Sequence, residues 1–182
     1  LLLKKIENQQ ILASKSAAKA QEHVDSVSRD QALGAIDRDL VSSLPMRRDM
    51  REPIEIMVVE DDAFSQKLVH NALQKDYSLT MTGDGQGAIM AYVKKAPDVL
   101  FLDIGLPDID GHAVLERIFK IDPHAYVVMF SGNGNKENVL RALELGAKGF
   151  VGKPFTKDKL LQYIERSPFI QAKHKRESEH GH

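Results

Sequence analysis

Five polar residues of this chain directly follow apolar runs, and their types suit phosphoryl chemistry. They are Glu60, Asp61, Asp103, Ser131 and Lys153. A short apolar run bounded by turn residues is typical of a strand buried on both faces. Each of the five is therefore expected where a strand ends, which is where open α/β sheets commonly keep their chemistry.

Three of these residues are carboxylates that we expect to meet. In a five-stranded parallel sheet of order 2-1-3-4-5, the first and third strands are neighbours, and ligands bind at that switch point. Glu60, Asp61 and Asp103 then converge, and they cannot all stay ionised unless a cation neutralises them. Mg2+ (or Mn2+) prefers such oxygen ligands and bridges to phosphate, so a metal site is predicted.

Ser131 and Lys153 add a hydroxyl donor and a positive charge on the other side of Asp103. A metal ion and an ammonium group together suit the equatorial oxygens of a transferring phosphoryl group, with Asp103 as nucleophile. Gly132 is small and leaves room for that group beside Ser131.

The elements that position these residues alternate regularly from residue 54 onward. The strand-like segments are Ile54–Val59, Tyr77–Thr82, Val99–Leu102, Tyr126–Phe130 and Lys148–Val151. Apolar residues at helical spacing follow each of them. The pattern predicts an α/β, flavodoxin-like (βα)5 fold, a doubly wound parallel sheet with right-handed crossovers.

The remaining segments differ in texture from this domain. Residues 1–44 have apolar and small residues at a three-four spacing, which predicts a long helix. It is either a coiled-coil strand or docking helix, giving a possible homodimer, or a flexible helical leader. Residues 45–53, bracketed by prolines, are expected to be a linker between this extension and a domain at 54–166. The polar tail, 167–182, is expected to be disordered.

Composition narrows the possible partners. The net charge of −1 gives no reason to expect binding to an anionic polymer. Cysteine is absent, which excludes thiolate metal sites. No apolar run approaches the roughly 20 residues of a membrane-spanning helix. We therefore expect a cytoplasmic protein with no direct nucleic-acid binding and no membrane partner.

Asp62 is interpreted as a helix cap and not as a further ligand.

Taken together, the motifs of residues 54–166 resemble the receiver domain of bacterial two-component response regulators, in particular the chemotaxis-regulator type. The segments that carry the resemblance are Val58–Asp62, Phe101–Pro107, Asp110-Gly111, Val128–Gly132 and Gly149–Phe155. The resemblance implies that Asp103 accepts a phosphoryl group from a histidine kinase or histidine phosphotransfer protein. It also implies direct metal binding by Asp61, Asp103 and the carbonyl of Gly105, with Glu60 acting through water.

The resemblance further implies how the phosphorylated state is read. Ser131, Lys153 and Gly132 would contact the phosphoryl group, and Ser131 and Phe150 would act as the switch pair. A cis peptide bond is implied before Pro154. The output would be a packing change on the face of the fourth helix, fifth strand and fifth helix, read by a downstream protein target. Such a protein catalyses only its own phosphorylation and dephosphorylation.

Three positions depart from the family pattern, and other functions stay open. Gly105 removes a side chain that in many relatives helps set phosphate lifetime, Asn133 fills the second such position, and Gly152 stands where a β-branched residue is common. The alternatives are a receiver fragment of a larger response regulator or hybrid kinase, and a non-phosphorylated receiver-like protein-binding module. A haloacid-dehalogenase-like phosphatase is disfavoured, because it needs an aspartate where Gly105 stands.

Overall fold

The computed structural model describes residues 10, 13–14, 37–132 and 134–181 of the chain. The chain divides into two units, Leu1–Ala35 and Ile36–His182. In the first unit, Gln10, Ala13 and Ser14 are helical and exposed. The predicted coiled coil and homodimer through residues 1–44 lie for the most part outside the described residues.

The second unit is built on one parallel sheet of order β2-β1-β3-β4-β5. The strands are β1 Glu55–Val59, β2 Ser78–Thr82, β3 Val99–Asp103, β4 Val127–Ser131 and β5 Gly149–Gly152. Every residue of β1, β3 and β4 is buried, because helices cover both faces and the strands need no polar side. The predicted strand order and parallel arrangement are confirmed.

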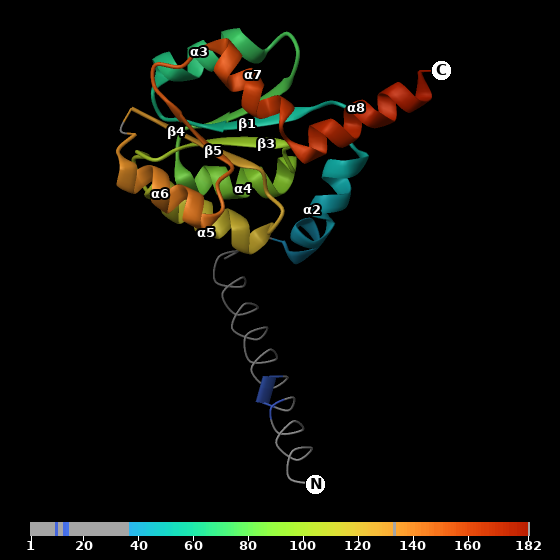
Figure 1. The fold of residues 1–182 in the computed structure, drawn as a ribbon, viewed down its shortest axis with the longest axis horizontal. Helices are drawn as coiled ribbons and strands as arrows, with labels where there is room; N and C mark the ends of the chain where they lie inside the picture. The colour runs from blue at the N-terminus through green and yellow to red at the C-terminus, as the bar shows by residue number, and fades with distance from the viewer. Residues whose placement is uncertain (1–9, 11–12, 15–36, 133, 182) are drawn as a thin grey trace. The chain divides into compact units, whose positions relative to one another are not determined.

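Five helices follow the five strands and cover the two faces. They are α3 Ala63–Leu73, α4 Gly85–Lys95, α5 Gly111–Ile121, α6 Lys136–Leu145 and α7 Lys157–Glu165. Figure 1 shows α3 and α7 on one face of the sheet and α4, α5 and α6 on the other. The side chain of the preceding residue caps each helix, by accepting a backbone N–H bond. Asp62 is one of these caps, and its hydrogen bond from the Ser65 amide lowers the pKa of Asp62.

Two segments predicted to be irregular are helical instead. Helix α2, Arg38–Met50, runs through Pro45, so the linker prediction for 45–53 is wrong up to residue 50, and the boundary at 44 falls inside a helix. Proline removes one helical hydrogen bond, but the burial of Leu44 and Arg48 on either side of it offsets that loss.

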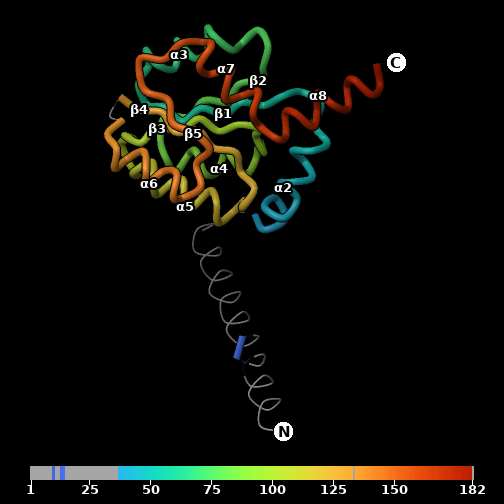
Figure 2. The backbone as a smooth tube through the Cα atoms, viewed as in Figure 1, coloured from blue at the N-terminus to red at the C-terminus, as the bar shows by residue number. Residues whose placement is uncertain are grey.

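The predicted disorder of residues 167–182 is also wrong over most of its length. Helix α8, Pro168–His180, begins with proline at its first turn, where the missing N–H costs nothing. Ile170 and Lys173 lie on one side of this helix and are buried. Their burial packs α8 against the domain, which the polar composition of the segment did not predict. Figure 2 traces α2 and α8 side by side at one end of the sheet. None of the helices within the described ranges is both long and apolar enough to cross a membrane.

Candidate functional site

Three carboxylates lie together at the carboxyl ends of β1 and β3. Glu60 and Asp61 directly follow β1, and Asp103 is the last residue of β3. One oxygen from each lies within 4.8 Å of the other two, the one such group found among the described residues. Glu60 and Asp103 are buried while Asp61 is exposed, so the cluster opens to solvent at Asp61. Oxygen donors of this kind fit a hard divalent cation such as Mg2+.

Lys153 faces the two buried carboxylates. Its Nζ donates a hydrogen bond to Glu60 Oε2 and lies 3.1 Å from Asp103 Oδ2. Burial acts to lower the pKa of Lys153, but the hydrogen bonds and charges of Glu60 and Asp103 outweigh it, so this pKa is raised. Burial raises the pKa of Glu60, against the opposing effect of Lys153. The peptide bond between Lys153 and Pro154 is cis.

Ser131 and two glycines surround the same end of the sheet. Ser131 ends β4 and is buried, and its carbonyl accepts a 3.1 Å bond from the amide of Lys153. The amide of Gly105 donates to Asp103 Oδ1 at 3.3 Å. Side-chain positions at Gly105 and Gly132 would meet no atom within 4 Å. A small side chain at either glycine would therefore point into open space.

Phe150 lies in the centre of β5 and is partly exposed. A side chain at Gly134 would come within 3.3 Å of its ring. The ring therefore lies beside Gly134, three residues after Ser131.

Three residues that support the site escaped individual prediction. A Cβ on Gly111 would lie 2.6 Å from Ile104 Cα and nearer still to the carbonyl oxygen of Asp103. The Asp108 carboxylate accepts from the amides of Gly85 and Gln86 at the start of α4, and the Gly85 bond lowers the pKa of Asp108. The buried ring of His112 bridges Asp110 Oδ1 (3.0 Å) and the carbonyl of Asn138 (3.2 Å), which joins α5 to α6. Only the Asp110-Gly111 pair gave a signal in the sequence.

A parallel (βα)5 sheet with acids, a hydroxyl and a lysine at one edge defines the class of phosphoryl-accepting signalling domains. The sequence model described as the response regulator receiver domain matches residues 56–165. The chain belongs to this family and is a phosphorylation-dependent signalling switch of the two-component type.

Individual relatives agree with this assignment. The chemotaxis protein CheY of Bacillus subtilis is 32% identical over 114 residues, which cover 62% of this chain and 95% of that protein. The CheX–CheY–BeF3–Mg2+ complex from Borrelia burgdorferi is similar in structure, with a TM-score of 0.58 and 31% identity over 62% of this chain and 87% of that chain. The receiver domain of NtrX from Brucella abortus is also similar in structure, with a TM-score of 0.58 and 37% identity. The match covers 62% of this chain and 96% of that chain.

Proposed function

We propose that Asp103 accepts a phosphoryl group from a histidine kinase or a histidine phosphotransfer protein. A carboxylate oxygen of Asp103 attacks phosphorus, the bond to the donor breaks, and an aspartyl phosphate forms. The observation that carries this proposal is the position of Asp103, with oxygens of Glu60 and Asp61 within 4.8 Å and Lys153 Nζ at 3.1 Å. Lys153 and Ser131 are proposed to hold the phosphoryl oxygens, with Gly132 leaving space for them.

We further propose that Asp61, Asp103 and the carbonyl of Gly105 bind Mg2+ directly, with Glu60 acting through water. The convergence of three carboxylates and the exposure of Asp61 support this arrangement. When bound, Mg2+ supplies positive charge that offsets the charge of the carboxylates and of the phosphoryl oxygens. The solved CheY complex from Borrelia burgdorferi contains BeF3 and Mg2+, which is consistent with this proposal.

Incubation with acetyl phosphate and Mg2+ should add one phosphoryl group, and excess EDTA should reduce the rate of addition at least about 100-fold. Without a cation, the three carboxylates repel an incoming phosphate dianion, a penalty of several kcal/mol. Intact-protein mass spectrometry measures the product. Labelling that is indifferent to EDTA would refute the metal proposal, and adding back excess Mg2+ controls for damage by the chelator.

An apolar surface beside the site suits the protein that donates the phosphoryl group. Phe64 is 69% exposed and Leu68 is 39% exposed, one helical turn apart on α3. Phe64 lies three residues after Asp61, so a donor docked on this face of α3 is close to Asp103. A phosphohistidine must be brought to the acceptor by contacts of this kind, whereas acetyl phosphate needs none.

Phe64→Ala should lower the rate of phosphotransfer from a cognate kinase or phosphotransfer protein about 10-fold or more. Removing a central aromatic contact commonly costs about 2 kcal/mol of binding free energy. The rate with acetyl phosphate should stay the same. Met90→Ala is the matched control, because Met90 is also an exposed apolar residue but lies on a different helix, α4. It should change neither rate. Equal losses with both donors would show that Phe64 supports the fold and not the docking.

A further inference from the structure

Helices α2 and α8 both lie outside the segment that matches the receiver family, 56–165, yet both are fastened to it. From α2, Arg47 donates to the carbonyls of Val93 (2.6 Å) and Lys94 (2.9 Å). Arg51 donates to the next two carbonyls, those of Lys95 and Ala96. These carbonyls end α4 and have no partner within their helix, so the arginines satisfy them.

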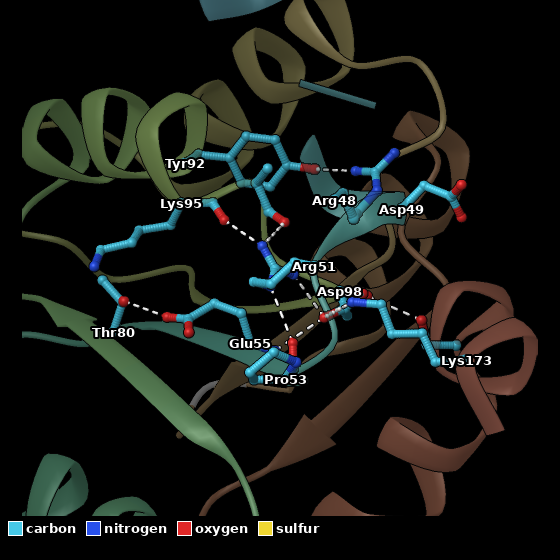
Figure 3. Close-up of polar contacts among 12 residues, drawn as sticks. Arg48, Asp49, Arg51, Pro53, Glu55, Thr80, Tyr92, Lys95, Asp98 and Lys173 are labelled. Atoms are coloured by element: carbon cyan, nitrogen blue, oxygen red, sulfur yellow. Dashed lines mark hydrogen bonds and ion pairs between the residues drawn. The ribbon is translucent and has the colours of Figure 1, made fainter. Parts of the chain in front are cut away.

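Cations from the two flanking segments share one buried carboxylate, that of Asp98. Arg51 Nη2 lies 2.7 Å and Lys173 Nζ 3.1 Å from Asp98 Oδ2, which also accepts the Glu55 amide at 2.9 Å. Asp98 is fully buried and Lys173 is only 4% exposed. Figure 3 shows Arg51 and Lys173 converging on Asp98 from the segments of α2 and α8, which we call the two arms. Burial lowers the pKa of Lys173 despite the neighbouring carboxylate.

A second buried contact also joins the arms. Arg48 of α2 donates to Asp122 Oδ2 at 2.6 Å, and Tyr92 donates to the same oxygen at 2.7 Å. The guanidinium carbon of Arg48 lies 3.7 Å from the centre of the Phe169 ring on α8, a distance suited to a cation–π contact. Arg48 therefore binds the domain through Asp122 and α8 through Phe169.

These shared contacts make the attachment of one arm depend on the attachment of the other. If α8 leaves, Arg48 loses the Phe169 ring and Asp49 loses Arg176, so two contacts that hold α2 are lost at once, while Asp98 keeps Arg51. We propose that α2 and α8 form a single clasp, in which detachment of either helix weakens the attachment of the other. A partner that displaces α8 would therefore also loosen α2.

The clasp lies at the opposite end of the sheet from the site. Glu55 begins β1 and Asp98 directly precedes β3, the two strands whose carboxyl ends carry Glu60 and Asp103. The clasp can therefore open without touching the phosphoryl site.

Hydrogen exchange of the full chain, followed by mass spectrometry, tests the clasp with Lys173→Met. Exchange in α8 should rise, and exchange in α2 should rise with it by at least about 10-fold, because opening of the clasp costs less free energy. Lys175→Met is the matched control, since Lys175 lies on the same helix but is exposed, and it should leave both helices unchanged. Phe169→Leu, a milder change, should also raise the rate of hydrogen exchange in α2.

Two outcomes would overturn the proposal. Faster exchange in α8 alone, with α2 unchanged in both variants, would show that the arms are independent. Equal acceleration in β1 and β3 in both variants would show that the arms open only when the whole domain unfolds.

Discussion

Phosphoryl incorporation from acetyl phosphate should fall at least about 100-fold when Asp103 is replaced by Asn. The amide keeps the shape of the side chain but is not a nucleophile, and loss of a nucleophile commonly removes nearly all of the rate. The fold should survive, because Asp103→Asn removes one of three clustered carboxylates and relieves their repulsion. Intact mass spectrometry measures labelling, and thermal unfolding checks the fold.

Asp76→Asn is the matched control for this experiment. Asp76 is an exposed aspartate in the turn after α3, so the same change of side chain there should leave labelling intact. If the Asp103→Asn variant were labelled at the wild-type rate, the acceptor would lie elsewhere, with exposed Asp61 as the nearest alternative.

Gly111→Ala should destabilise the domain by about 3 kcal/mol, among the larger effects of a single methyl group. The added Cβ would lie 2.6 Å from Ile104 Cα, and the other close atoms also belong to the backbone of Asp103. Backbone atoms cannot rotate away as a side chain does, so either α5 or the end of β3 must move. For a domain of this size the loss corresponds to a fall in Tm of about 10 °C. Labelling of Asp103 should slow as well, because the acceptor shifts with the end of β3.

Gly132→Ala is the control for this prediction, since a Cβ there would meet no atom within 4 Å. Its effect on the free energy of unfolding should stay within about 0.5 kcal/mol. A Gly111→Ala variant as stable as the wild type would show that α5 and β3 can separate without cost.

The sheet could be predicted because burial imposes a simple pattern on its strands. The predicted segment Val99–Leu102 differs from β3 by one residue, and that residue is Asp103, whose polarity hid its place in the strand. The meeting of Glu60, Asp61 and Asp103 follows from strand order alone, since residues at the carboxyl ends of neighbouring strands share an edge.

The clasp could not be predicted, because nothing local marks it. Arg48 and Lys173 are buried by partners 74 and 75 residues away in the chain, and in sequence they look like solvated surface charges. Proline at 45 and the polar tail gave signals for a linker and for disorder. Both signals describe intrinsic preference, which tertiary contacts overrode here. The need for glycine at position 111 could not be predicted for a related reason. It depends on how closely α5 approaches the end of β3.

The ion pair between Glu60 and Lys153 joins residues 93 positions apart, which has a consequence for the order of biosynthesis. A ribosome makes the three acids first, and the lysine that compensates them emerges only with the end of β5. A nascent chain that stops before residue 153 therefore carries an uncompensated acidic edge and lacks the phosphate contact proposed for Lys153. Completion of the proposed phosphoryl site is thus tied to completion of the sheet.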